Sequence, residues 1–549
     1  MLPKAESITV EFKSDKDCYP DGELVAAIVA MANAQGGTLY LGIEDNGTVT
    51  GLHPKHLGKI DGLAALIYNM TNPNLSVQTE DVEVDGLHIA KIVIPRASRI
   101  IFTSRGSCLR RRLDSKGLPE VIPFNPQDQL SHLADLQVFD LSAQPVPNTT
   151  VDDLSPFERA RLREYIAIYN GDRYLLELDD DELDSALGLV TKVEGQTVPT
   201  LTGLLILGKE SVLRRAVPTH EIAFQVLDGE EVRMNEFLRK PLLAAMSEIE
   251  TLVKPLNIEK EFLDGMFRVA VPRIDARAFR EAVLNAIAHR DYTKHGAIHI
   301  QFFEEELKIS NPGGFVDGVS LDNLLTTPPR PRNIALADAL KRIGLVERTG
   351  RGIDLIYRGL LRYGRATPDY RESTSSSVSL TMSLSDVDDV FFKRVLIEED
   401  RLGKALPIDT LIILDAIRHQ KRLTLVELAH VVQKNPDRVR PSVETMVEYG
   451  LLTTEGKRPV RYKLAPSLYK LLDKKAEQIR SKQIAEAERP LAIRAFCKEY
   501  GSITRKQVAD LCRISPPSAA KILSQMERDG ELEKQGKVPR NYYVLKAPE

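Results

Sequence analysis

The sequence contains few cysteines, and their spacing excludes one common kind of site. Its 549 residues include Cys18, Cys108, Cys497 and Cys512 as the only cysteines, and no two of them have CxxC spacing. Structural zinc sites normally need such pairs, so we expect no structural zinc. A large chain with so little cysteine is suited to a reducing compartment, and we expect a cytoplasmic protein.

Long apolar runs and a P-loop are also missing. The first residues, MLPKAESITVEFK, have no apolar segment of the kind found in secretory signals. The longest apolar stretch, residues 24–32, is far too short to cross a bilayer, so we expect no membrane role. No GxxxxGK[ST] motif occurs, which excludes an ordinary P-loop helicase motor.

The composition indicates a globular protein of several domains. Hydrophobic residues make up 43% and charged residues 28% of the chain, and 549 residues exceed what one hydrophobic core usually organises. The net charge of −4 is unevenly distributed, because residues 466–549 carry 17 Lys and Arg against 11 Asp and Glu. A basic C-terminal section beside an acidic body indicates a nucleic-acid partner.

The C-terminal region contains an internal repeat with an offset of 80 residues. In each copy a threonine (Thr424 or Thr504) is placed to cap a helix, a proline follows in a turn, and a further helix ends at Gly450 or Gly530. Two short β-like runs around a Gly-Lys pair complete each copy. This order is typical of winged helix-turn-helix domains, expected at 405–470 and 485–549. A role in docking or dimerisation remains the alternative.

In a winged helix the last helix enters the major groove of duplex DNA and the wing contacts phosphate. The candidate DNA contacts therefore come from these two segments of each copy. In the first copy they are Arg438, Arg440, Lys457 and Arg461, and in the second Ser518, Lys521, Gln525, Lys537 and Arg540.

The middle of the chain, predicted as one domain over 151–385, contains a polar stripe on an apolar helix. In FREAVLNAIAHRDY, Glu281, Asn285 and His289 have the i, i+4, i+8 spacing that places them on one helix face. An NPGGF segment at 311–315 and a glycine-containing TGRG segment at 349–352 follow. Earlier in this domain, the apolar run LTGLLILG at 201–208 predicts a buried strand.

These motifs resemble the GHKL ATPase superfamily, in its divergent branch labelled ATP-binding and helicase-like. The resemblance implies an α/β sandwich that binds ATP or another adenine nucleotide. It also implies that Asn285 binds Mg²⁺ and that Glu281, one turn earlier, positions water. The usual adenine-binding aspartate is replaced by Asn311, whose amide still accepts a hydrogen bond. Gly313 and Gly314 follow it, and Gly350 and Gly352 match the phosphate lid. Binding without hydrolysis and weak ATPase activity both remain open.

The N-terminal residues alternate between helix and hairpin signals. An alanine-rich helix is predicted to end near Gly36-Gly37, and the strand TLYLGI follows. Asn46-Gly47 and Asp85-Gly86 each predict a β-hairpin turn. The segment 96–116 is strongly basic and includes Arg105, Arg110, Arg111 and Arg112.

The combination ESxxxEFK, ANxxGGTLYLGIxDNG and SRGS is similar to the Schlafen AlbA_2 domain, also called the divergent AAA-4 domain, over residues 1–125. The resemblance implies a small α+β nucleic-acid-binding domain. In the nuclease branch of that family three carboxylates bind Mg²⁺ or Mn²⁺ and cleave RNA; here these match Glu6, Glu11 and Asp45. Lys13 and the four arginines would then hold the RNA backbone.

Two interpretations of the three carboxylates remain open. Glu6 and Glu11 lie five positions apart, on opposite faces of a regular strand, and converge only if Glu6 precedes the strand in a turn. Alternatively, Glu6 pairs with an arginine to brace the fold and Asp45 only begins a hairpin.

We therefore expect an α+β multidomain protein: a Schlafen AlbA_2 α+β domain, a linker at 126–150, a GHKL-like α/β sandwich and two winged helix-turn-helix domains. The leading functional hypothesis is a DNA-binding transcriptional regulator with a nucleotide-sensing central domain, assembled as a homo-oligomer. The alternative is a metal-dependent endoribonuclease of host defence that cuts tRNA or another structured RNA.

Overall fold

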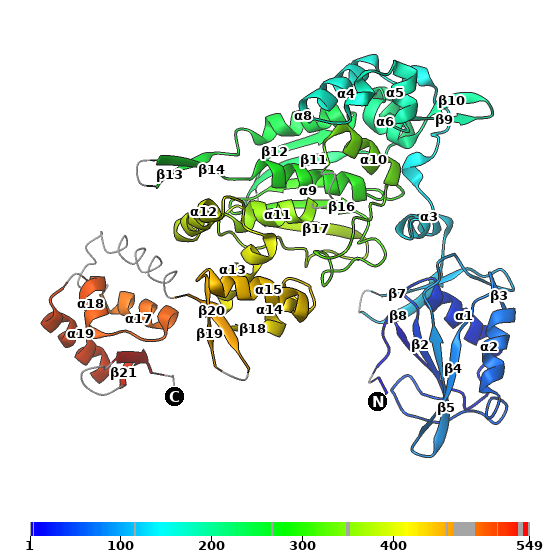
Figure 1. The fold of residues 1–549 in the computed structure, drawn as a ribbon. Helices are drawn as coiled ribbons and strands as arrows, with labels where there is room; N and C mark the ends of the chain where they lie inside the picture. Colours follow the sequence, from blue (N-terminus) through cyan, green and yellow to red (C-terminus); the bar gives the residue numbers. More distant parts are fainter. Residues whose placement is uncertain are drawn as a thin grey trace.

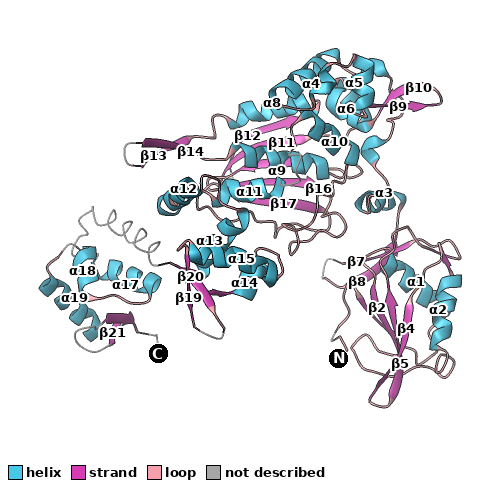
Figure 2. Cartoon of the chain, in the orientation of Figure 1, coloured by secondary structure: helices cyan, strands magenta, loops and turns pink. Residues whose placement is uncertain are grey.

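The computed structural model describes residues 2–3, 5–114, 117–229, 231–264, 267–346, 352–456, 459–465, 489–512, 514–535 and 542–546. Figure 1 follows the chain from the N-terminal domain through a large central part to the C-terminal units, and Figure 2 shows that each of these regions combines helices with strands. Helices in the described part of the chain do not reach the length and apolarity needed to span a membrane.

The N-terminal domain is built on a mixed sheet in the order β1-β2-β5-β4, with β1 parallel to β2 and the other neighbours antiparallel. Leu24, Ile28 and Met31 of α1 pack against Leu39 and Leu41 of β2. Smaller sheets pair β3 with β6 and β7 with β8. The elements are β1 (Val10–Lys13), α1 (Asp21–Ala32), β2 (Gly37–Leu41), α2 (Ile60–Asn69), β3 (Thr71–Asn72), β4 (Gln78–Val84), β5 (Leu87–Ile94), β6 (Phe102–Thr103), β7 (Leu109–Leu113) and β8 (Pro119–Pro123).

The glycine pair before β2 is required by the close approach of two backbones. Gly37 has φ +131°, and a Cβ placed there would lie 2.1 Å from the carbonyl oxygen of Thr9. The next residue, Thr38, donates its N–H to that same oxygen at 2.8 Å. Only glycine therefore allows β1 and β2 to begin their parallel pairing here.

Both predicted hairpin turns of this domain are confirmed. At the first, the Gly47 N–H donates to the Glu44 carbonyl at 2.8 Å and the Glu44 N–H to the Thr48 carbonyl at 2.9 Å. At the second, β4 and β5 are joined by Asp85 and Gly86, which both have positive φ, as a two-residue hairpin turn requires.

The central part packs around a mixed sheet in the order β12-β11-β15-β16-β17, in which only the β11–β15 pair is parallel. Helices α9 and α11 pack against each other, and α9 also contacts β15 and β16 (Figure 1). One hydrophobic core extends from Leu154 to Leu384.

The chain enters this part through α3 (Pro126–Asp135) and η1 (Leu141–Ala143). Its remaining elements, in chain order, are η2 (Val151–Asp153), α4 (Pro156–Ile168), η3 (Arg173–Leu176), α5 (Asp180–Ala186), β9 (Val190–Val193), β10 (Gln196–Pro199), α6 (Leu201–Leu207), α7 (Glu210–Ala216), β11 (Ile222–Asp228), β12 (Glu231–Leu238), α8 (Leu242–Val253), β13 (Glu259–Asp264), β14 (Phe267–Pro272), α9 (Ala276–His289), β15 (Ile298–Phe302), β16 (Glu306–Pro312), α10 (Ile334–Ile343), α11 (Gly352–Leu361) and β17 (Ser377–Ser383).

The strand predicted at 201–208 is wrong, because this segment forms helix α6. Thr200 caps the helix by accepting the Gly203 N–H on its hydroxyl at 3.0 Å. The residues from Leu201 to Leu207 are all buried, so no polar face reveals the helical period. A Cβ at Gly203 would lie 1.9 Å from the Leu189 carbonyl oxygen, which explains a glycine inside a helix.

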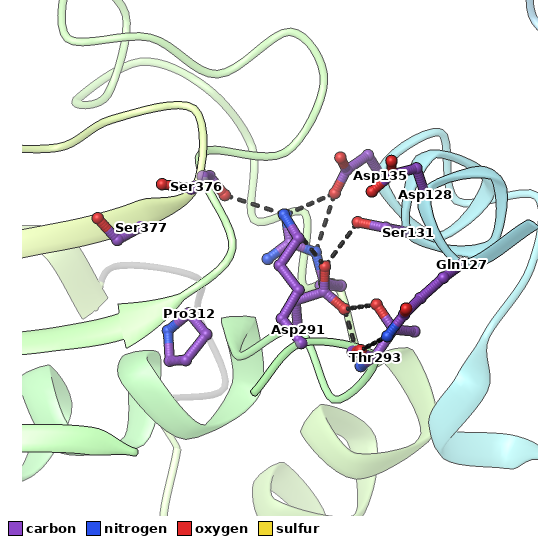
Figure 3. Close-up of polar contacts among 12 residues, drawn as sticks. Gln127, Asp128, Ser131, Asp135, Asp291, Thr293, Pro312, Ser376 and Ser377 are labelled. Carbon is purple, nitrogen blue, oxygen red and sulfur yellow. Dashed lines mark hydrogen bonds and ion pairs between the residues drawn. The ribbon is translucent and has the colours of Figure 1, made fainter. Parts of the chain in front are cut away.

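The segment predicted as a linker, 126–150, contains α3 and is bonded to the central part. Ser131 of α3 donates its hydroxyl to the Asp291 carboxylate at 2.6 Å, and Asp135 forms an ion pair with Arg332 at 2.5 Å. Figure 3 shows Ser131 and Asp135 directed from α3 toward Asp291 and its neighbours. Its Pro, Gln and Asp content indicated a connector, whereas Asn125 and Pro126 begin a capped helix.

Two similar helical units follow the central part. The first C-terminal unit (408–465) has a sheet in the order β18-β20-β19, and the second (489–545) pairs β21 with β22. Helix α12 (Asp389–Leu402) precedes them. Their elements are α13 (Ile408–Gln420), β18 (Leu423–Thr424), α14 (Leu425–Val431), α15 (Pro436–Glu448), β19 (Leu452–Glu455) and β20 (Arg461–Leu464), then α17 (Arg489–Tyr500), α18 (Arg505–Cys512), α19 (Pro516–Arg528), β21 (Leu532–Gln535) and β22 (Tyr542–Leu545).

The repeat is visible in the way the second helix of each unit begins. Thr424 and Glu427 form a capping box, in which the Glu427 N–H donates to the Thr424 hydroxyl at 3.3 Å. Thr504 and Gln507 make the corresponding bonds, with the Gln507 N–H also 3.3 Å from the Thr504 hydroxyl. Both threonine caps predicted from the repeat are therefore confirmed.

Candidate functional site

A cavity opens in the central part beside helix α9. Its wall includes Glu281, Asn285 and His289, which confirms that the predicted polar stripe shares one face. The cavity volume is about 210 Å³. One water needs only about 10–15 Å³ of such space, so the cavity has room for an organic ligand. Its lining is mostly apolar with a few polar groups, as is usual for small-molecule sites.

Glu281 is fixed at the back of the cavity by the start of α11. It is 5% exposed, and its Oε1 lies 1.9 Å from where a Cβ at Gly352 would stand. A side chain at 352 would therefore displace the Glu281 carboxyl. Tyr370 is buried nearby, where burial first and Glu281 to a lesser degree raise the pKa of its phenol, so Tyr370 stays a neutral hydrogen-bonding group.

The NPGG segment is shaped by packing as well as by the cavity. Asn311 and Gly314 both line the cavity, and Asn311 is 5% exposed. A Cβ at Gly314 would lie 2.7 Å from the Ser375 carbonyl oxygen. A Cβ at Gly313 would lie 2.2 Å from the Arg332 guanidinium. The need for glycine at 313 is thus explained by its left-handed backbone, with φ +99°, and by Arg332, without any ligand.

His289, at the end of α9, adds a neutral imidazole to the cavity wall. Desolvation by burial, reinforced by the positive charge of Arg332, lowers the pKa of His289 to about 4. At neutral pH the ring therefore carries one N–H donor and one nitrogen acceptor and does not attract anions through charge.

The opposite wall is a loop that sequence reasoning missed. Residues 315–331, here called the cavity loop, connect β16 to α10, and nine of them line the cavity: Phe315, Val316, Val319, Leu324, Leu325, Thr327, Pro328, Pro329 and Arg330. Apart from Phe315, the last residue of the NPGGF segment, no motif marked this segment. Its three prolines and its irregular spacing of apolar residues were the available signals. Of the predicted phosphate-lid glycines, Gly352 lines the cavity and Gly350 lies outside the described residues.

Three contacts fix the cavity loop to other parts of the chain. Asp317 forms an ion pair with Arg96 of the N-terminal domain. The Pro331 carbonyl accepts a hydrogen bond at 3.3 Å from Gln137, just after α3. Gln433 of the first C-terminal unit contacts the backbone of the loop.

In the N-terminal domain, Glu6 precedes a turn, as its convergence with Glu11 would require. Ser7 and Val10 exchange backbone hydrogen bonds across this turn, and the Glu6 carboxylate accepts the Phe12 N–H at 2.8 Å. The Glu6 side chain is therefore directed toward the backbone of β1, and, against the larger lowering by burial, its negative charge raises the pKa of Arg111.

Glu11 is held by two cations. It is 4% exposed, forms an ion pair with Arg111 and lies 2.5 Å from the Lys13 ammonium. Arg111 is itself 2% exposed and donates to the carbonyl oxygens of Ser7, at 2.9 Å, and Val10, at 3.0 Å. Burial lowers the pKa of Arg111, opposed by Glu6.

Arg111 therefore braces the β1 turn. This position does not favour the predicted RNA-backbone contact, because a buried guanidinium with these partners is not presented to phosphate.

Asp45 is not brought into this group. It lies exposed in the hairpin turn, and its charge raises the pKa of Tyr19 as the smallest of the contributions, the largest being burial. Its neighbour Glu44 accepts hydroxyl hydrogen bonds from Ser14 and Thr50, both at 2.8 Å, and these bonds lower the pKa of Glu44. Within the described ranges, no cluster of three or more His, Cys, Asp or Glu is arranged to bind a metal.

The other arginines of the basic segment differ in their exposure to solvent and in their partners. Arg105 is exposed in the turn between β6 and β7. Arg110 lies over the Phe124 ring at 5.3 Å, and Arg112 is exposed but paired with Glu120 at 2.6 Å. Arg105 and Arg112 are thus the exposed members of the four predicted RNA-backbone contacts.

The candidate DNA contacts of the C-terminal units lie on exposed helix faces where they are described. Arg438 and Arg440 are exposed on α15, and Arg461 is exposed at the start of β20. Ser518, Lys521 and Gln525 are exposed on α19, where Ser518 and Gln525 bond to the neighbouring Ser515 and Asp529 of the same helix region. Lys457, Lys537 and Arg540 lie outside the described residues.

Three segments of the chain match known protein families. Residues 6–119 match the family described as "Schlafen, AlbA_2", and residues 295–382 match "Putative ATP-dependent DNA helicase recG C-terminal". Residues 131–223 match "Domain of unknown function (DUF8451)". The chain thus combines a Schlafen AlbA_2 domain with a RecG-related C-terminal domain and an uncharacterised domain between them.

Among solved structures, the chain is similar to the DIP2311 protein from Corynebacterium diphtheriae, with 22% identity and a TM-score of 0.52 over 85% of this chain and 94% of that one. This likeness shows a shared fold. The N-terminal domain of a RecG-related protein from Nitrosomonas europaea is 28% identical, covering 17% of this chain and 65% of that one, but its TM-score of 0.14 does not establish a common structure. No curated protein matches the chain.

The Glu11–Arg111 ion pair predicts that two of the three carboxylates differ in their contribution to stability. Glu11→Ala leaves Arg111 buried without its carboxylate and should lower the free energy of unfolding by about 3 kcal/mol. Asp45→Ala removes an exposed turn residue and should change it by less than about 0.5 kcal/mol. Urea unfolding followed by circular dichroism measures both. Equal stability of the two variants would contradict the bracing role.

The pKa of His289 predicts a pH dependence of stability. The unfolded imidazole has a pKa of about 6.5, whereas in the folded chain it is about 4. Between these values the unfolded state binds more protons, so the free energy of unfolding falls as the pH is lowered through this window. His289→Gln should reduce this slope, measured as thermal midpoints at pH 7 and pH 5. His430→Gln, at an exposed position of α14, serves as the control and should leave the slope unchanged.

Proposed function

We propose that this protein is a DNA-binding transcriptional regulator whose central domain binds ATP or another adenine nucleotide. The observation that carries the proposal is the position of the exposed helix α15, with Arg438 and Arg440, in a unit that contacts the wall of the Glu281–Asn285 cavity. A sensor and a DNA-reading helix are thereby joined in one chain.

The element order of both C-terminal units supports winged helix-turn-helix domains. In the first unit, α14 and α15 are joined by a short turn, and β19 and β20 form an antiparallel hairpin that pairs with β18. The buried residues Val439, Val443 and Met446 fix α15 against the core, which leaves its arginines facing outward. Such a helix fits the major groove, with the hairpin beside the phosphates.

The cavity supports nucleotide binding through the RecG-related C-terminal match and the residues on α9. Asn285 is half-buried on the cavity wall, where its amide oxygen would bind a Mg²⁺ ion carried by the nucleotide, and Glu281 one turn earlier would position water. Asn311 stands in place of the usual aspartate and would accept the adenine amino group. Because this acceptor is a neutral amide, the proposal is sensing by binding, with hydrolysis at most slow.

The alternative of a metal-dependent endoribonuclease needs Glu6, Glu11 and Asp45 to bind Mg²⁺ or Mn²⁺ together. Glu11 instead neutralises Arg111 and Lys13, and Asp45 is exposed in a separate turn. This arrangement supports nucleic-acid binding by the N-terminal domain, through residues such as Arg105, more than cutting.

The DNA-binding proposal is tested with the double variant Arg438→Ala, Arg440→Ala. Removing two phosphate or base contacts should weaken binding to labelled duplex DNA by at least about tenfold and reduce the salt dependence of the affinity. Fluorescence anisotropy at several salt concentrations measures both quantities. The Arg214→Ala variant of α7, whose exposed guanidinium pairs with Glu210, is the arginine control.

Unchanged affinity in the double variant would contradict the role of α15. Incubation with tRNA in Mn²⁺ and in EDTA belongs to the same experiment. Metal-dependent cutting that is lost in both Glu11→Ala and Asp45→Ala would establish the endoribonuclease in place of the regulator.

Nucleotide binding is tested with Asn285→Ala. Loss of the Mg²⁺ ligand should weaken the binding of labelled ATP in Mg²⁺ by at least about tenfold, since it removes an interaction with a charged group. Asn257→Ala, which alters an amide bonded to Ile274 outside the cavity, is the control. Equal ATP binding by wild type and Asn285→Ala would remove the cavity from the proposed function.

A further inference from the structure

Gln433 joins the first C-terminal unit to the cavity loop through both ends of its side-chain amide. Its Nε2 donates to the Leu321 carbonyl at 2.7 Å, and its Oε1 accepts the Leu325 N–H at 2.8 Å. Leu325 itself lines the cavity. A single side chain therefore fixes the backbone of the loop on either side of Leu324, which also lines the cavity.

The position of Gln433 is the turn between α14 and α15. This turn sets the angle between the two helices and hence the direction of α15, which carries Arg438 and Arg440. The loop backbone at Leu321 and Leu325 is thus joined to the turn of the helix pair by two hydrogen bonds, with no intervening residue.

The backbone at Gln433 is left-handed, with φ +56°. Glycine adopts this conformation without steric cost, whereas a residue with a side chain does not. The turn therefore carries a backbone cost that glycine would remove, and what glutamine provides instead is the amide bonded to the loop. A left-handed glutamine that bonds to the cavity loop indicates that these two hydrogen bonds have a role of their own.

A second connection runs through α11. This helix packs against both the cavity and the first C-terminal unit. Gly352 and Ile353, at the start of α11, line the cavity, whereas Tyr357 and Leu361 further along belong to the hydrophobic core of the first C-terminal unit. Arg358 of the same helix donates to the Leu406 carbonyl at 2.7 Å, just before α13.

We propose that the Gln433 amide couples occupancy of the cavity to nucleic-acid binding by the first C-terminal unit. This inference rests on the proposed function and adds its regulation. A nucleotide in the cavity contacts the cavity loop and thereby favours one arrangement of the loop, the Gln433 turn and α15. Because coupling between two sites is reciprocal, DNA bound to α15 changes the affinity for the nucleotide by the same factor.

The test uses the full chain, ATP with Mg²⁺ and labelled mixed-sequence duplex DNA. In the wild type, saturating ATP should change the Kd for DNA by a factor of about 5–150, the usual range of coupling between sites. DNA should change the Kd for ATP equally. Gln433→Gly removes the amide and suits the left-handed backbone, so it should fold, bind each ligand and lose this mutual effect.

Two further variants separate the amide from the backbone. Glu194→Gly makes the same backbone change at an exposed left-handed residue in the β9–β10 turn, and should keep the full coupling factor. Gln433→Asn tolerates a positive φ but is one methylene shorter, so it should not reach both loop groups and should lose coupling. Thermal unfolding checks that the variants are folded.

The outcomes are distinct. A wild type that binds ATP and DNA independently overturns the coupling and leaves the proposed function intact, as does a Gln433→Gly variant that keeps the wild-type factor. A wild type that does not bind ATP, or does not bind DNA, overturns both. The coupling is supported if ATP and DNA change each other's Kd in the wild type and in Glu194→Gly but do not do so in Gln433→Gly and Gln433→Asn.

Discussion

The arrangement of α3 on the central part depends on one buried guanidinium. Arg332 is 3% exposed and bonds at once to Asp135 of α3, to the His289 carbonyl at the end of α9 and to the Gly314 carbonyl beside the cavity. A charge removed from water in this way is stable only with all its partners in place, because each missing partner leaves an unpaired buried group. The connecting helix, the helix of the polar stripe and the glycine segment are therefore positioned by the same side chain.

This dependence extends to the chemistry of the cavity. The charge of Arg332 helps to keep His289 neutral, and its bulk, together with the φ of +99° at residue 313, requires glycine there. Features that resemble ligand-binding signals in the sequence thus serve packing and electrostatics first. The α9 wall of the cavity, which this network holds, is preformed, so that a ligand would not have to order that wall.

Local patterns in the sequence predicted much of the fold. The Asn46-Gly47 and Asp85-Gly86 turns, the threonine caps of the repeated units and the shared face of Glu281, Asn285 and His289 all depend on residues close in sequence, and the structure confirms them. The turn that precedes β1 was only a condition for Glu6 and Glu11 to converge, and the structure contains it.

Where the outcome depends on distant residues, the sequence was insufficient. The α6 segment is buried on every side, so its apolar run had no period that distinguishes helix from strand. Arg111 looked like one of several surface arginines, and only its three-dimensional neighbours Ser7, Val10 and Glu11 reveal a brace. Beyond Phe315 the cavity loop has no motif, and its role follows from what lies across the cavity.

The two C-terminal units present unlike surfaces on their last helices, and this has a consequence for the DNA sites they would occupy. Arg438 and Arg440 are exposed in the first two turns of α15, whereas Ser518 and Lys521 are exposed in the same part of α19, where Arg528 is exposed only at the end of the helix. A symmetric dimer of identical units reads a palindrome, because both halves meet the same base pairs. Two unequal readers within one chain favour instead a tandem, non-palindromic site whose halves differ in sequence, and binding of the second half is strengthened by the local concentration that the first provides.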